Sequence, residues 1–289
     1  MPNHMFLMSF DETHLNNLNK TLNSFFDYIF ALFSQKTNIN FCYIGTAKKD
    51  SFFDGLFFSK FIQAKFGKNV NIIKLLLTKT KKTITQIEAL LETQDIIFIG
   101  GGNTAFMLDI WESKGLTHVL NRLRAENRLP LIAGVSAGGM FPFKAGLSDY
   151  TPGYYKSLTC LGWFNNSFCP HADSKKESLC DTNKRLSRMS AYQSAINEGH
   201  LPPGYAVPND CMLHFYDNNL VRALSSRESN DCYFVDKNSV SNIETVFLNY
   251  EHSPLTLKYK SHPKCWKKLF NLISLIHQYF HLITKVVAG

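Results

Sequence analysis

Short apolar runs alternate with helix-length amphipathic segments over residues 39–135, and this alternation limits the fold more than any other feature of the chain. The apolar runs occupy 40–44, 70–76, 95–99 and 130–133. Strands that are apolar on both faces and alternate with helices are typical of a parallel sheet covered on two sides. We therefore expect an α/β fold with three layers, in which a mostly parallel sheet carries helices on both faces.

The pattern changes after about residue 206, where helix-length segments give way to short strand-like runs. These runs cover 212–216, 220–224 and 232–235, and Asp217-Asn218-Asn219 is a turn signal between the first two. Closely spaced runs of this kind predict antiparallel strands that extend the sheet in the C-terminal part of the domain.

We divide the chain into an N-terminal helical segment packed on the domain (1–38), a main domain (39–240) and a C-terminal extension (241–289). The first part contains Ser9-Phe10-Asp11-Glu12, which has the pattern of a capping box with Ser9 as the N-cap of a helix. The last part contains an amphipathic segment after Trp266. That segment would suit packing on its own domain, a homodimer contact or an anionic membrane surface, and we favour packing on the domain or on a dimer partner over membrane binding.

Composition and charge exclude several classes of partner. Of 289 residues, 45% are hydrophobic and 19% are charged, which is ordinary for a globular protein. The net charge of +8 is spread along the chain without a nucleic-acid-binding motif, so we expect a solvated basic surface and no nucleic-acid partner. No charge-free apolar run reaches the length that spans a bilayer.

The seven cysteines indicate reduced thiols, because their number is odd and no Cys-x-x-Cys pair occurs. Together with the absence of a secretory signal pattern, this predicts a cytoplasmic protein. The spacing of cysteines and acids around His171 fits no common zinc pattern, so we expect neither a metal nor a cofactor.

Two glycine-rich turns follow predicted strands, at the sheet edge where α/β proteins bind ligands. Residues 134–138 read Gly-Val-Ser-Ala-Gly, the G-x-S-x-G pattern of a nucleophile elbow that would expose the hydroxyl of Ser136. Residues 100–104 read Gly-Gly-Gly-Asn-Thr and lack the Lys-Ser/Thr of a phosphate-binding P-loop. We expect the N–H groups of Gly102 and Ala137 to form an oxyanion hole. A tight turn with an unreactive serine would give the same pattern.

A nucleophilic serine needs a base and a group that orients the base. Among ten histidines, His171 follows a short apolar approach and a proline, while His200, His214 and His252 remain alternatives. Asp149 lies between Ser136 and His171 in the sequence and is our candidate for the acid, although it would also suit an ordinary loop.

Three separated motifs together resemble the peptidase E family (dipeptidase E, alpha-aspartyl dipeptidase) of serine peptidases, and more distantly cyanophycinase. The motifs are residues 97–104, residues 134–138, and Gly162 with residues 167–171, which read Ser-Phe-Cys-Pro-His. Segments 201–206 and 225–227 also look like that family's later segments. The resemblance runs from about residue 40 to residue 235.

The resemblance implies a fold like that of class I glutamine amidotransferases, and metal-free hydrolysis by a Ser-His-Asp/Glu triad. On the matching positions, Ser136 is the nucleophile, His171 the base and Asp149 the acid, with Gly102 and Ala137 in the oxyanion hole. The substrate would be a small peptide.

Peptidase E removes N-terminal aspartate from dipeptides, and such a site needs a cation for the aspartate. Lys184, Arg185 and Arg188 are candidates, and we take Arg185 and Asn103 as the substrate-binding residues. Where the family opens with a Gly-rich strand end, this chain is expected to enter a helix directly after residue 9. The alternatives are an esterase of the α/β-hydrolase type, whose histidine would come late in the chain, and an inactive binding module or membrane-associated protein.

Overall fold

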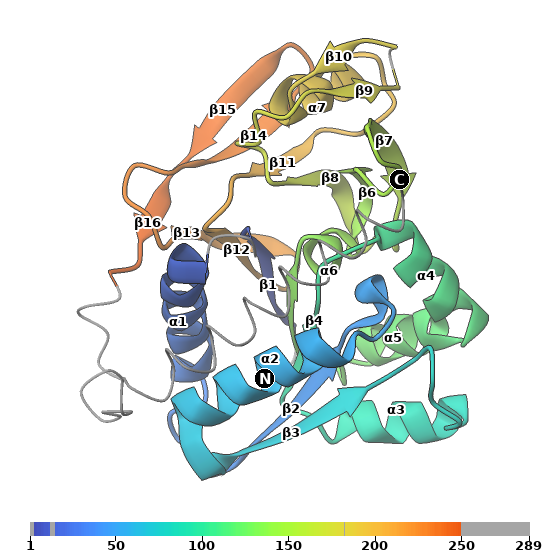
Figure 1. Cartoon of the computed structure of the whole chain (residues 1–289), viewed down its shortest axis with the longest axis vertical. Coiled ribbons are helices and arrows are strands. Elements are labelled where there is room, and N and C mark those ends of the chain that lie inside the picture. The colour runs from blue at the N-terminus through green and yellow to red at the C-terminus, as the bar shows by residue number, and fades with distance from the viewer. Residues whose placement is uncertain (1–2, 12–14, 182, 250–289) are drawn as a thin grey trace, which may run out of the picture.

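A computed structural model describes residues 3–11, 15–181 and 183–249 of the chain. Their strands form two eight-stranded sheets, and Figure 1 shows the second sheet lying above the first. The candidate active site lies where the two sheets meet, so the sheet order decides which segments reach it.

The first sheet has the mostly parallel centre that the sequence predicts. Its strand order is β16 (Thr245–Phe247), β13 (Asn219–Ser225), β12 (Cys211–Tyr216), β1 (His4–Ser9), β5 (Leu131–Val135), β4 (Ile96–Ile99), β2 (Ile39–Ile44) and β3 (Val70–Leu75). Five neighbouring strands of this sheet are parallel to one another, in the order β1, β5, β4, β2 and β3. β12 is antiparallel to both of its neighbours, β1 and β13. The antiparallel extension predicted after residue 206 is therefore confirmed for β12 and β13.

Helices cover both faces of this sheet, which confirms the predicted three layers. On one face, α1 (Leu15–Ala31) and α2 (Phe52–Phe66) bury a cluster of aromatic side chains against Phe41 and Phe98. On the other face, α3 (Ile84–Glu92), α4 (Thr104–Ser113) and α5 (Leu116–Ala125) bury Trp111 and the side chains around it. Burial of apolar surface on both faces explains why strands such as β4 are apolar throughout.

The second sheet is mixed, and the sequence analysis expected only one sheet. Its order is β10 (Arg185–Leu186), β9 (Ser178–Cys180), β7 (Tyr154–Thr159), β6 (Phe143–Ser148), β8 (Phe164–Pro170), β11 (Gly204–Val207), β14 (Cys232–Asp236) and β15 (Ser239–Ile243). α7 (Arg188–Asn197) packs against it. The predicted strand at 232–235 exists but belongs to this sheet, because β14 pairs with β11.

The prediction that residues 1–38 are a helical segment is wrong for residues 4–9. These residues form β1, which lies in the first sheet between β5 and β12. Ser9 is the last residue of this strand and not the N-cap of a helix; α1 begins at Leu15. The helix pattern after residue 15 was interpreted correctly, but a six-residue apolar strand before it carries too little periodicity to be recognised.

The predicted start of the C-terminal extension at residue 241 falls inside β15, so the second sheet continues across that boundary. β16 then returns to the first sheet beside β13. The predicted amphipathic segment after Trp266 lies outside the described residues. Over the ranges that the structure describes, no helix is long and apolar enough to cross a membrane.

Candidate active site

The predicted elbow is a sharp turn between β5 and the short helix α6 (Ala137–Met140). Ser136 has φ 53° and ψ −108°, a conformation that residues with a Cβ rarely adopt. The turn requires its glycines: a Cβ on Gly134 would lie 1.9 Å from the carbonyl oxygen of Gly138, and one on Gly138 would lie 2.1 Å from that of Ile99. The local sequence therefore forces the Ser136 side chain out of the strand.

The structure brings Ser136 and His171 together from different sheets. His171 directly follows β8, and its Nε2 lies 3.0 Å from the Oγ of Ser136. Both residues are half-buried, so the pair is partly open to solvent. This distance is within hydrogen-bond reach of a nucleophile and its base.

The other ring nitrogen of His171 contacts an amide and not a carboxylate. Nδ1 lies 2.7 Å from Oδ1 of Asn209. An amide oxygen can only accept a hydrogen bond, so this contact places the ring proton on Nδ1 and leaves Nε2 free to accept the hydroxyl proton of Ser136. Asn209 thus selects the tautomer that a general base needs.

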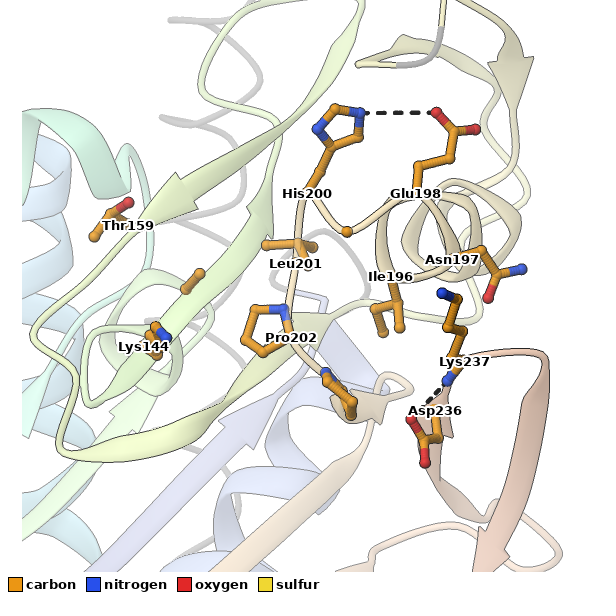
Figure 2. Close-up of a pocket in the computed structure, with 13 residues that line it drawn as sticks. Lys144, Thr159, Ile196, Asn197, Glu198, His200, Leu201, Pro202, Asp236 and Lys237 are labelled. Atoms are coloured by element: carbon orange, nitrogen blue, oxygen red, sulfur yellow. Dashed lines mark hydrogen bonds and ion pairs between the residues drawn. The ribbon is translucent and has the colours of Figure 1, made fainter.

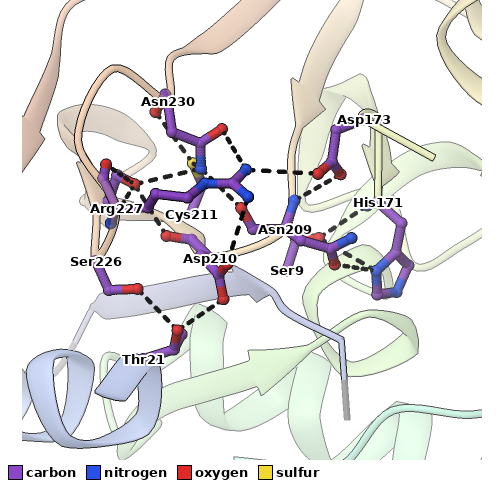
Figure 3. A network of polar contacts seen from close by, with 11 residues as sticks. Ser9, Thr21, His171, Asp173, Asn209, Asp210, Cys211, Ser226, Arg227 and Asn230 are labelled. Carbon is purple, nitrogen blue, oxygen red and sulfur yellow. Dashed lines mark hydrogen bonds and ion pairs between the residues drawn. The ribbon is translucent and has the colours of Figure 1, made fainter. Parts of the chain in front are cut away.

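A network of polar contacts behind His171 fixes Asn209 (Figure 3). Its backbone N–H donates to Asp173 Oδ1 at 2.8 Å, and its carbonyl accepts from Asn230 Nδ2 at 2.8 Å. The guanidinium of Arg227 lies 3.6 Å from Asp173 and donates a hydrogen bond of 3.0 Å to Asn230. Because its backbone is held on two sides, Asn209 presents its amide to the ring in one orientation.

Among the hydrogen bonds of the described residues, none joins Asp149, the predicted acid, to the imidazole of His171. Its carboxylate forms a 3.0 Å ion pair with Arg188, and its side chain is 61% exposed. Arg188 is buried, donates to the carbonyl of Leu147 and lies over the ring of Tyr155. The position of Asp149 in the sequence could not reveal this, because the ion pair depends on Arg188, which lies 39 residues further along the chain.

The surroundings of His171 favour its neutral form. Burial lowers the pKa of the imidazole below its ordinary value of 6.5, and the guanidinium of Arg188 lowers it further. The hydrogen bond to Asn209 and the carboxylates of Asp149 and Asp173 act in the opposite direction. An imidazole that stays neutral below pH 6.5 can accept a proton over a wide range of pH.

The second glycine-rich turn lies against the elbow, as predicted. A Cβ on Gly101 would lie 3.2 Å from the Cβ of Ser136. Gly102 has φ +136°, and a Cβ there would lie 2.5 Å from the carbonyl oxygen of Ala47, so only glycine fits. Asn103 is the N-cap of α4, since its Oδ1 accepts from the N–H of Phe106 at 2.9 Å.

Comparison of the sequence with known protein families finds a match. The model of peptidase family S51 matches residues 5–222. The chain belongs to this family. The resemblance to peptidase E is therefore confirmed, and the matched region also includes residues 5–9 of β1, which precede the predicted start of the resemblance near residue 40.

One curated protein and two solved structures are similar to this chain. The peptidase is 30% identical over 204 residues to the uncharacterized peptidase YgaJ of Bacillus subtilis (strain 168), covering 70% of this chain and 80% of that protein. The fold is also similar to the crystal structure of a peptidase from an acI-B1 Actinobacterium, with a TM-score of 0.54 and 14% sequence identity. The aligned region covers 85% of this chain and 95% of that peptidase. A Listeria monocytogenes EGD-e protein assigned to peptidase E has a TM-score of 0.49 at 16% identity, covering 76% of this chain and 98% of its own.

Arg185, predicted to bind substrate, lies on β10 at the edge of the second sheet. Its side chain is exposed, and its guanidinium donates to the carbonyl of Glu177 at 3.4 Å. Among the contacts of the described residues, none joins it to Ser136 or His171. Arg188, another candidate, is buried against Asp149 and is not open to a ligand.

Lys48 is a cation that the structure places beside the glycine-rich turn. A Cβ on Gly102 would lie 2.9 Å from Cγ of Lys48. The ammonium group forms a 3.0 Å ion pair with Asp54 in the first turn of α2. Lys48 could not be recognised from the sequence, because nothing in residues 45–51 indicates that this segment packs against residue 102.

Two of the alternative bases, His200 and His214, lie away from Ser136. His200 faces Glu198 at 3.7 Å in an open groove of about 660 Å³ at the C-terminal end of α7, which Figure 2 shows and which contains neither Ser136 nor His171. His214 stacks on Phe6, and burial, with His4 and Arg222 nearby, lowers its pKa to about 4. His252 lies outside the described residues.

The cysteines of the described ranges are free thiols and mostly core residues. Burial raises the pKa of Cys42 and Cys160 to about 12 and that of Cys169 to about 11, so these thiols are poor nucleophiles. Within the part of the chain that the structure describes, no group of three or more His, Cys, Asp or Glu residues could hold a metal ion.

Sequence reasoning missed two residues that contact His171. Asn209 follows β11 in an unremarkable Pro-Asn-Asp turn, and a neutral amide was not considered for the third position. Ser9 was assigned to a helix start, but its Oγ accepts the backbone N–H of His171 at 2.8 Å. Neither residue lies within a motif that indicates contact with a histidine, so only the fold reveals them.

Proposed function

We propose that this serine peptidase of family S51 is an exopeptidase that hydrolyses short peptides, dipeptides included, through an acyl-enzyme on Ser136. The observation that carries the proposal is the 3.0 Å contact between Ser136 Oγ and His171 Nε2 at a strained strand-to-helix elbow. The free thiols suit the reducing cytoplasm in which we expect the enzyme to act.

In the first half of the reaction, His171 Nε2 takes the proton of Ser136 while the oxygen attacks the scissile carbonyl carbon. The N–H groups of Gly102 and Ala137 would bind the oxyanion that forms. Ala137 is the first residue of α6, where an N–H has no carbonyl partner inside the helix. The C–N bond then breaks, and the imidazolium gives its proton to the leaving amine.

In the second half, water replaces the amine. His171 takes a proton from the water, whose oxygen attacks the ester carbonyl, and the released Ser136 oxygen regains the proton. We propose Asn209, in place of Asp149, as the group that orients the base. Because its amide is neutral, it fixes the tautomer without adding a charge that stabilises the imidazolium.

Lys48 supports the finer proposal that substrates begin with an acidic residue. Its side chain lies against Gly102, so a carboxylate next to the scissile carbonyl could reach its ammonium group. Asp54 holds that group in place and partly offsets its charge. Selectivity for an acidic first residue would then be a preference and not an absolute requirement.

The test is hydrolysis of a dipeptide panel that includes Asp-Xaa and Ala-Xaa, with Ser136→Ala as the inactive control. We expect cleavage by the wild type, none by Ser136→Ala, and about a tenfold loss in Lys48→Ala for Asp-Xaa alone. Cleavage that survives in Ser136→Ala would contradict the nucleophile. A fluorophosphonate probe that labels Ser136 while every peptide stays intact, but simple esters are cut, would favour the esterase alternative.

A further inference from the structure

Ser9 is fully buried at the end of β1, in the centre of the first sheet. The end of this strand contacts both members of the candidate catalytic pair. The carbonyl of Met8 accepts the backbone N–H of Ser136 at 3.0 Å, and the Oγ of Ser9 accepts that of His171 at 2.8 Å. Two consecutive residues therefore link the elbow of the first sheet to the histidine that follows β8 of the second.

The backbone of His171 needs such support, because it has φ +56°. A residue with a Cβ in this left-handed region is strained and persists only where its surroundings hold it. A backbone N–H that loses its partner in a poorly solvated site also carries a desolvation cost. The hydroxyl of Ser9 meets both needs with one hydrogen bond.

The hydroxyl of Ser9 also lies beside the imidazole ring. Its Oγ is 3.5 Å from Nδ1, the nitrogen that faces Asn209 (Figure 3). The opposite nitrogen, Nε2, faces Ser136. With no exposed surface, Ser9 cannot touch a substrate. Of the catalytic pair, the residue that the Ser9 hydroxyl contacts is His171.

We propose that Ser9 is a positioning residue, which holds the backbone and ring of His171 so that Nε2 stays within hydrogen-bond reach of Ser136. The proposal rests on the proposed function, in which His171 is the base. It assigns a role to the one polar side chain that β1 directs at the site, a role that the elbow and the glycine-rich turn do not supply.

The experiment measures how fast, and how completely, a fluorophosphonate probe labels Ser136 in the full chain. We expect Ser9→Ala to be labelled completely but about ten- to a hundredfold more slowly than wild type, with an unchanged half-saturating probe concentration. Rate and extent separate two causes: a badly positioned base slows every molecule, whereas misfolding reduces the fraction that reacts.

The matched control is Ser24→Ala, which removes another buried hydroxyl, one that bonds to the carbonyl of Lys20 within α1. It should be labelled at the wild-type rate. If Ser9→Ala does not fold, Ser9→Cys is measured instead, and it should also react more slowly because a thiol is a weaker acceptor. Wild-type rates in the Ser9 variant that folds would overturn the proposal. A wild-type protein that is not labelled at all would overturn the proposed function and, with it, this role of Ser9.

Discussion

The Oγ of Ser136 and the Nε2 of His171 lie 3.0 Å apart, yet different kinds of contact hold the two residues in place. The turn that carries Ser136 is shaped mainly by its own neighbours, because Gly134 and Gly138 allow the close backbone contacts of the elbow, and the carbonyl of Met8 adds one distant hydrogen bond. His171 is positioned by side chains that are distant in the sequence: Ser9 is 162 residues away, and Asn209 is 38 residues away. One half of the pair is a local motif, and the other half is a product of the tertiary fold.

This difference predicts how substitutions near Ser136 and substitutions near His171 should affect stability and activity. A change in a local turn alters the backbone that carries the nucleophile and should damage the fold and the activity together. A change in a distant support should leave the fold largely intact and affect mainly the alignment of the base. Substitutions in the two sets therefore test the comparison, and we order them from the largest expected effect to the smallest.

The largest effect should follow Gly138→Ala. The added Cβ would lie 2.1 Å from the carbonyl oxygen of Ile99, so β4 and α6 would have to separate. We expect fluorophosphonate labelling to be lost and the Tm to fall by about 10 °C, as for a strongly overpacked core. Gly55→Ala in α2 is the control, since its nearest neighbour is the flexible side chain of Lys74. A Gly138→Ala protein that melts and reacts like wild type would refute the local account.

A smaller effect should follow Asn209→Ala, which removes the acceptor at Nδ1 of His171. We expect kcat or the labelling rate to fall about ten- to a hundredfold while the Tm changes little, because the ring loses its fixed tautomer. Asn121→Ala is the matched control: it removes an amide oxygen that accepts from the ring N–H of Trp163 at 2.6 Å, in another part of the molecule. Equal rates in the two variants would show that Asn209 does not orient the base.

The smallest effect concerns pH. Because burial and Arg188 lower the pKa of His171, the acidic limb of the kcat/KM profile should lie below pH 6.5. Asp149 acts in the opposite direction, so Asp149→Asn should move this limb further toward acid and change the plateau rate by no more than about threefold. A loss of several hundredfold in Asp149→Asn would instead return Asp149 to the acid position of a triad.

The same contrast explains what the sequence could and could not predict. The parallel centre of the first sheet, the elbow and the histidine after β8 were predictable, since periodicity and short motifs encode them locally. β1, the second sheet and the third member of the site were not. β1 was taken for a helix start because Ser9 to Glu12 imitate a cap, and Asp149 was preferred because carboxylates usually orient such a histidine. Only tertiary contacts decide those positions.

The central place of β1 in the first sheet also has a consequence for when the enzyme can fold during its synthesis. Met5 pairs with Ile132 in β5, and His4 pairs with Tyr216 in β12, so β1 is synthesised well before both of these partner strands. Contacts this distant along the chain close slowly, and a nascent chain emerges from its N-terminus onward. Until β12 has left the ribosome, β1 lacks one of its two neighbouring strands. Asn209, which lies two residues before β12, emerges only shortly before that strand. The peptidase should therefore stay inert during its own translation and gain activity only when nearly the whole family domain has been made.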